Sequence, residues 1–235
     1  MYDIITKLST DENYYDEARE VYGTDNIYEL AKLIAADTPK KPIVAEKDIV
    51  VIKSCGTGTQ PAKEIVDWCI KNDVPVEFFN QPVKIADYVD TLDHAFDGCK
   101  SFNQPFTLPD RVTSCRHMMC NCEVFNQPMT LPPNLKDATA MFAHCYELDQ
   151  DIHLETAPNL VKMECMFYEC KKLNRSFTVS DSIKDTGLLH AFAGCESLNS
   201  LIQLPYINDM EIFFGIFEGC TNLSITNIKM SERPR

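Results

Sequence analysis

The most reactive side chains in this 235-residue sequence belong to its eleven cysteines. One short run places Cys115, His117, Cys120 and Cys122 together, and thiolates and imidazoles are the ligands that Zn²⁺ accepts. The spacing is not that of paired CxxC knuckles, so we predict no metal site. No Ser/His/Asp or Cys/His arrangement is recognisable from the spacing either. We therefore predict that the chain is not an enzyme and carries no cofactor.

A second pattern that could bind a ligand is the loop Gly56-Thr57-Gly58-Thr59. It follows a β-branched run at 48–53 and precedes Pro61–Asn72, which we predict to be a helix with Pro in its first turn. Phosphate-binding loops lie between a strand and a helix in this way. A third glycine and a Walker lysine are missing. A nucleotide-dependent enzyme or regulator that uses these four residues is the alternative function.

Six of the cysteines recur in phase along the chain. Their intervals are 23, 23, 25, 25 and 25 residues, and the positions are Cys99, Cys122, Cys145, Cys170, Cys195 and Cys220. A large apolar residue stands three places before each cysteine, and Phe or Leu stands three places after it. Asn usually follows, as at Asn103, Asn126, Asn174 and Asn199. The pattern predicts a stack of similar structural units.

Each unit contains two patterns of apolar residues. The first has the 3-1-3 spacing of one helix face, as in Leu92, Ala95, Phe96 and Cys99. The second is an alternating pair typical of a half-buried strand, for example Met129 and Leu131. A unit of one short helix and one short strand cannot bury its face alone. The fold class is therefore α/β, a curved solenoid with a parallel sheet on one face and short helices on the other.

The solenoid interpretation gives most cysteines a packing role. The six in-phase thiols form a buried column, Cys115 belongs to a core column, and Cys69 faces the interior of the N-terminal region. Cys165 shares a helix-edge column with His94, His117 and His190. Only Cys55, in the glycine loop, and Cys120, at an exposed variable position, remain without such a role.

The repeats resemble a known family. AFDGCKSFNQPFTLPDRV, AFAGCESLNSLIQLP and IFEGCTNLSITNI are similar to BspA-like leucine-rich repeats, with their AFxGCxxLxxIxLP pattern. The FNQP runs at 79–82, 102–105 and 125–128 are similar to a related bacterial and viral repeat class. The resemblance implies a leucine-rich-repeat horseshoe and a binding role, and it suggests a bacterial or phage origin.

The predicted domain organisation has three parts. Residues 1–78 form a non-repeat α/β N-terminal cap, 79–230 form the solenoid of about six units with a leading half-repeat, and 231–235 are a tail. Helices are expected at 14–21 and 26–36, and strands at 48–53 and 74–79. Trp68 and Ile65 on the Pro61–Asn72 helix would plug the first unit, because the open end of a solenoid needs a cap.

The outward-facing positions of the predicted strands are the candidate binding face. They hold polar side chains on a surface too wide for a small molecule. The residues are Gln104, Thr107, Gln127, Thr130, Asp151, His153, Arg175 and Thr178. We expect a non-enzymatic protein that binds a protein partner through this face or through the acidic cap, for instance as an inhibitor of a host protein or as a virion component.

The charge and hydropathy of the chain limit the kinds of partner and the locations that we expect. The net charge of −13 argues against a direct nucleic-acid contact, although an acidic surface that mimics nucleic acid is a further alternative. Residues 1–93 carry 10 basic and 18 acidic groups, so the cap is the more acidic part. No apolar run is long enough to cross a membrane, and the start lacks the pattern of a signal peptide. We expect reduced thiols and a cytoplasmic or virion-associated location.

Overall fold

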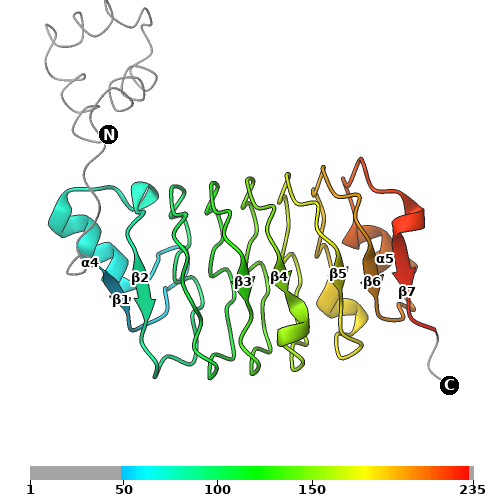
Figure 1. The fold of residues 1–235 in the computed structure, drawn as a ribbon, viewed down its shortest axis with the longest axis horizontal. Coiled ribbons are helices and arrows are strands. Elements are labelled where there is room, and N and C mark those ends of the chain that lie inside the picture. Colours follow the sequence, from blue (N-terminus) through cyan, green and yellow to red (C-terminus); the bar gives the residue numbers. More distant parts are fainter. Residues whose placement is uncertain (1–48, 233–235) are drawn as a thin grey trace, which may run out of the picture.

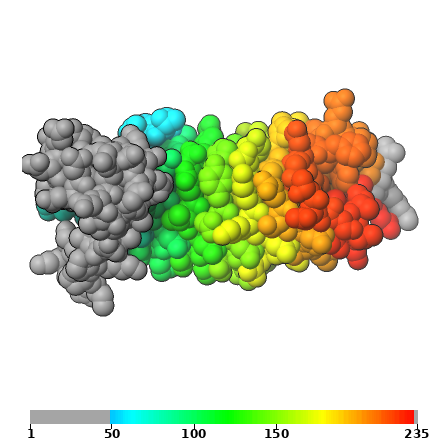
Figure 2. All heavy atoms as spheres, turned by 90° about the horizontal axis from the view of Figure 1, so that it is seen from above, coloured from blue at the N-terminus to red at the C-terminus, as the bar shows by residue number. Residues whose placement is uncertain are grey.

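The computed structural model describes residues 49–232, and it is a row of similar coils stacked side by side (Figure 1). The predicted helices at 14–21 and 26–36 lie outside the described residues. Two perpendicular views show an almost straight row, without the pronounced curvature of a horseshoe (Figures 1 and 2). Short strands run in parallel, as the fold class predicted, and paired strands of the repeats are separated by 23–26 residues in the chain.

The first described elements cover the N-terminal end of the row. Strand β1 (Val50–Ile52) pairs in parallel with β2 (Val83–Ile85), and helix α4 (Lys63–Asn72) lies between them in the chain. The predicted second strand at 74–79 is wrong, because Val76–Phe78 forms the 3₁₀ turn η2 and β2 takes the place beside β1. The Trp68 ring meets the Phe79 ring edge-on at 5.5 Å, and Ile65 is fully buried. Both side chains therefore close the first coil as predicted.

The strands on the sheet side are short and form separate small sheets. Strands β3 (Met129–Thr130) and β4 (Ile152–His153) pair with each other. Strands β5 (Phe177–Thr178), β6 (Ile202–Leu204) and β7 (Ile228–Met230) form a second parallel group. The 3₁₀ turn η3 (Leu154–Thr156) directly follows β4. Phe106 and Leu108, which have the same alternating spacing as Met129 and Leu131, lie in no strand.

The predicted short helices are absent from the first five units, whose turn segments are 92–102, 115–125, 138–148, 163–173 and 188–198. In the first segment Ala95 N–H donates to the Leu92 carbonyl, whereas His94 N–H donates to the Arg116 carbonyl of the next coil (2.8 Å). N–H groups thus alternate between bonds within a coil and bonds to the next coil. An α-helix would use all of them internally. The 3-1-3 spacing suits these successive turns as well as it suits a helix.

Each turn segment needs residues with left-handed backbone conformation, which costs conformational energy. His94, His117, Ala140, Cys165 and His190 occupy one equivalent position, and all have φ between 51° and 55°. A second position holds Gly98, Asn121, His144, Glu169, Gly194 and Gly219, with φ from 55° to 76°. Such φ values are unfavourable for non-glycine residues, so the hydrogen bonds to the neighbouring coils must hold them.

An asparagine ladder runs along the edge where each turn segment ends. Asn103 N–H donates to Asn80 Oδ1, and Asn126 N–H donates to Asn103 Oδ1, both at 2.9 Å. The same bond recurs at every later coil, at Asp149, Asn174, Asn199 and Ser224. Each side chain thereby accepts a backbone N–H of the following coil. This explains why Asn, or its isostere Asp, recurs next to the Phe or Leu position.

The core is one continuous column of side chains from Val50 to Ile216. Stacked phenylalanine rings run through it, with ring centroids 5.9 Å apart for Phe79–Phe102 and 5.7 Å apart for Phe142–Phe167. At the C-terminal end helix α5 (Met210–Ile216) replaces the turn segment. Its N–H groups are satisfied within the helix, capped by Asp209, so the last coil does not need a following one.

Removing one rung of the ladder tests whether it holds the coils together. We expect Asn126→Ala to lower the free energy of unfolding by about 1–3 kcal/mol, because Asp149 N–H loses its acceptor. Asn126→Asp keeps an acceptor oxygen and should retain most of the stability, as Asp149 does naturally. Urea unfolding followed by circular dichroism measures both. Equal destabilisation by the two variants would contradict the role of the ladder.

Candidate functional site

The outward residues of the parallel strands form one exposed row. Thr130 lies opposite His153 in the β3–β4 register, and Thr178 lies opposite Gln203 in the β5–β6 register. Their inward neighbours Met129, Ile152 and Phe177 are buried. We call Thr107, Thr130, His153 and Thr178 the sheet-face row, and all four are exposed. The predicted inside–outside alternation is thus present at Thr130, His153 and Thr178, whereas Phe106 and Leu108 beside Thr107 are only half-buried.

Three other predicted face residues have their side chains engaged by the asparagine ladder. The amide of Gln104 donates to Asn80 Oδ1 and that of Gln127 donates to Asn103 Oδ1, both at 3.0 Å. The Arg175 guanidinium binds the Asp149 carboxylate at 3.0 Å and also the Asp149 carbonyl. These polar groups stabilise the ladder, a contribution that sequence reasoning missed. Asp151 is exposed beside the row.

The glycine loop packs against the first turn segment. Gly56 N–H donates to the Asp93 carbonyl (2.7 Å), and Thr57 and Gln60 exchange backbone hydrogen bonds across a tight turn. A Cβ on Gly56 would lie 2.4 Å from the His94 carbonyl oxygen, so only glycine fits there. Gly58, with φ of 60°, makes the turn. Two of the four loop N–H groups, those of Gly56 and Thr57, are thus already used within the fold, which disfavours the nucleotide alternative.

The cysteine column is buried as predicted for Cys115 and for five of the six in-phase thiols, whereas the sixth, Cys220, is half-buried. The thiols from Cys122 to Cys220 each donate to the carbonyl of the residue that occupies the Phe96 position in the preceding coil, at 3.0–3.2 Å. Burial raises the thiol pKa of Cys99 and of Cys115 far above its ordinary value. All cysteines among the described residues are unpaired. Such thiols pack as small apolar groups with a weak donor.

The prediction that Cys120 occupies an exposed position is wrong. Cys120 is 8% exposed and packs with Ala140, Ala143, Cys165 and Tyr168. Burial raises the pKa of its thiol to about 12. The reason is the turn geometry, which brings the equivalent positions of neighbouring coils into contact where a helix would have turned them to solvent. Cys165 lies at a half-buried position, although on a turn and not on a helix edge.

Two of the three histidines in the predicted column are neighbours. The rings of His94 and His117 stack in parallel with centroids 4.8 Å apart. His94 Nδ1 lies 3.0 Å from Asp97 Oδ2, and Asn121 donates to Asp97 Oδ1. Burial, and then the neighbouring His94, lower the pKa of His117. Within the described residues no three His, Cys, Asp or Glu side chains are placed to hold a metal ion.

The coils, the parallel strands and the columns of equivalent side chains define a mixed α/β repeat protein. A family model described as "Mycoplasma protein of unknown function, DUF285" matches residues 76–132 and 90–205, which together span more than half of the chain. The chain therefore belongs to this family, in agreement with the repeat pattern. Among the residues that the structure describes, no helix has the length and apolarity needed to cross a membrane.

One solved structure similar to this chain is that of a leucine-rich repeat protein from T. pallidum. The two chains are 21% identical, with a TM-score of 0.44. The match covers 61% of this chain and 65% of the T. pallidum chain, so this chain spans slightly less than two thirds of that protein. No curated protein matches this chain.

Thiol labelling tests the packing of the cysteines. We expect Cys55, Cys165 and Cys220, the half-buried members, to react first with a maleimide in the folded protein. The fully buried column reacts only after unfolding, because burial disfavours the reactive thiolate. Mass spectrometry of the labelled peptides identifies the reacted sites. Rapid labelling of Cys122 or Cys145 in native buffer would contradict the packing.

The stacked histidines predict a pH dependence of stability. Because folding lowers the pKa of His117, the unfolded chain takes up that proton first as pH falls below about 6.5. The free energy of unfolding should therefore fall with decreasing pH, until the pH passes the lowered pKa. His117→Asn, which tolerates the left-handed φ of 51°, removes this contribution. Urea midpoints of both proteins against pH measure the difference, and parallel curves would contradict it.

Proposed function

We propose that this chain is a non-enzymatic binding protein, built as a leucine-rich-repeat-type solenoid, that recognises a protein partner through the sheet-face row. The observation that carries the proposal is the continuity of this row across coils. Thr107, Thr130, His153 and Thr178 stand exposed on adjacent coils, and the residues beside the last three are buried, whereas those beside Thr107 are half-buried. Neighbouring parallel strands lie about 4.8 Å apart, and this spacing sets the distance between successive residues of the row.

The row has the properties of a surface for a macromolecule. Threonine side chains are stiff and lose little conformational entropy when a partner covers them. The backbone beneath them is fixed by the asparagine ladder and by the bonds between turn segments. A standard protein interface buries about 800 Å² per partner, an area that a face several strands wide can supply. Small molecules instead prefer an enclosed apolar pocket.

Charge supports a basic or neutral partner. The chain carries a net charge of −13, which steers oppositely charged proteins towards it and repels nucleic acid. The row itself is almost uncharged. Its histidine, His153, has Nδ1 at 2.9 Å from Glu155 Oε1. The acidic cap, the other predicted contact surface, lies mostly outside the described residues.

Charge insertion tests the sheet face. A variant with Thr107→Glu, Thr130→Glu and His153→Glu should lose at least about tenfold in affinity for a partner captured by the wild-type chain, because unpaired charges are buried on binding. Its melting temperature should stay close to that of the wild type, since all three side chains are exposed. Biolayer interferometry and a thermal melt measure the two quantities.

A control variant carries two added glutamates away from the row. Thr57→Glu and Thr221→Glu place the same kind of charge on exposed positions outside the row. This control should bind as the wild type does. Unchanged affinity of the sheet-face variant, or an equal loss in the control, would refute the placement of the binding surface.

A further inference from the structure

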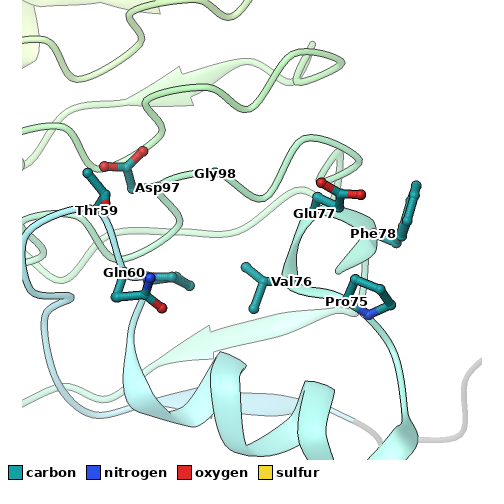
Figure 3. A pocket seen from close by; sticks show the side chains of 9 residues that line it. Thr59, Gln60, Pro75, Val76, Glu77, Phe78, Asp97 and Gly98 are labelled. Carbon is teal, nitrogen blue, oxygen red and sulfur yellow. The ribbon is translucent and has the colours of Figure 1, made fainter. Parts of the chain in front are cut away.

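The N-terminal end of the core column is covered by the elements that precede the first coil. Helix α4 lies there, and the ring of its Trp68 meets the Phe79 ring edge-on. The stretches 59–61 and 75–78 border the first turn segment, with a pocket of about 420 Å³ between them (Figure 3). The first coil therefore has neighbours on both of its sides.

The C-terminal end of the column lacks such a cover beside β7. Helix α5 covers the turn side, where the Phe213 ring meets the Phe217 ring edge-on at 6.2 Å. Towards the sheet, apolar side chains of the last coil are half-buried or exposed, although their equivalents one coil earlier are fully buried. The former are Leu223, Ile228 and Met230, and the latter are Leu198, Ile202 and Leu204. Ile225 is 69% exposed. The described part of the chain places no further coil on this apolar surface.

Strand β7 is also an open edge of its sheet. Ser231 N–H donates to the Leu204 carbonyl of β6 (3.0 Å), and Ile228 N–H donates to the Ile225 carbonyl. Backbone groups along a strand point alternately to its two sides, so the N–H and C=O of Met230 point away from β6. Among the described residues β7 is the last strand of this sheet. Such an edge is a template for a further strand.

Lys229 gives this edge its charge. Its side chain is exposed between Ile228 and Met230, and it has no ion-pair partner among the described residues. Residues 225–235 contain three basic residues and one acidic residue, although the chain as a whole carries a net charge of −13. Two copies of β7 side by side would bring two lysines together, which is unfavourable. An acidic side chain opposite Lys229 would instead be favourable.

The pairing of β6 with β7 shows what a further strand needs. Gln203 lies opposite Lys229, with apolar residues opposite each other on either side. A strand with an acidic residue between two apolar ones would cover the end of the core, pair with the Met230 backbone and neutralise Lys229. A helix could cover the apolar surface, but its backbone groups are bonded internally and cannot pair with Met230.

We propose that the outer edge of β7 binds an extended segment of a partner protein, which adds as a further strand and carries an acidic residue between two apolar ones. Backbone hydrogen bonds to Met230 align the segment, and its side chains give specificity. The parallel sheet of β5, β6 and β7 is thereby continued. This edge is separate from the sheet-face row, so each of the two proposals can fail without the other.

A titration of the full ¹⁵N-labelled chain with the peptide acetyl-Ser-Thr-Ile-Glu-Leu-Thr-Ser-amide tests the edge. We expect saturable shifts of the Lys229 and Met230 amide signals at millimolar peptide. Hydrogen exchange of the Met230 N–H should slow because it gains an acceptor, whereas Ser231 N–H, already bonded to Leu204, should change less. A peptide with serine in place of isoleucine and leucine should not bind. No saturable shift, or equal binding of the serine peptide, would overturn the proposal.

An exchange of charges locates the contact. Lys229→Glu should weaken binding of the glutamate peptide by at least about threefold, and it should favour a peptide with lysine in place of glutamate. Lys84→Glu makes the same change at an exposed position of β2, at the other end of the row, and should bind as the wild type does. Thermal melts check that both variants fold. Equal affinity of the wild type and Lys229→Glu for both peptides would refute the assignment.

Two further measurements exclude other occupants and other surfaces. Sedimentation velocity should show a monomer at all concentrations. A dimer that dissociates in Met230→Pro, which lacks the outward N–H, would show that β7 binds a second copy, and would overturn the proposal. The variant with Thr107→Glu, Thr130→Glu and His153→Glu should bind the glutamate peptide as the wild type does. Loss of binding in this variant would place the peptide on the sheet-face row instead.

Discussion

The backbone hydrogen bonds between neighbouring turn segments are the interaction on which the rest of this structure depends. Every second N–H of a segment donates to the next coil, as His94 does to Arg116 and Phe96 does to Met118. This alternation excludes an α-helix and requires residues with positive φ at fixed places. It also sets the spacing of the coils, so that equivalent side chains stack. The phenylalanine, cysteine and asparagine columns all follow from it.

The same bonding pattern explains how the row of coils ends. An inner coil needs a neighbour on each side, because its backbone groups are left without partners otherwise. At the N-terminal end α4 and Trp68 cover Phe79. At the C-terminal end α5 satisfies its own N–H groups within the helix. Both α-helices therefore stand where the repetition stops, and α-helices are absent from the turn segments between them.

The backbone groups and core side chains of the stack are paired or buried within it. The groups that can contact a partner therefore lie at its surface. The thiols are buried and hydrogen-bonded, and the glycine loop is used for packing. The features that remain available are the sheet-face row and the outer edge of β7, where the repeat stack ends. Membership of the DUF285 family accounts for the repeats and names no activity. The two proposals rest on these surfaces, one for a protein contact across the sheet face and the other for an added strand.

The repeat, its phase, the parallel strands and the buried columns follow from the sequence alone, because a period of 23–25 residues requires equivalent residues to stack. It also identified the role of Trp68 and Ile65, since an apolar helix face must cover the open end. Tertiary structure alone decided that the turn segments are not helices, because one apolar spacing fits both and only the bonds to the next coil select between them. It also decided the burial of Cys120 and the use of Gln104, Gln127 and Arg175 in the ladder. Each of these results from contacts between residues of different coils, which lie 20 or more positions apart in the sequence and leave no local pattern.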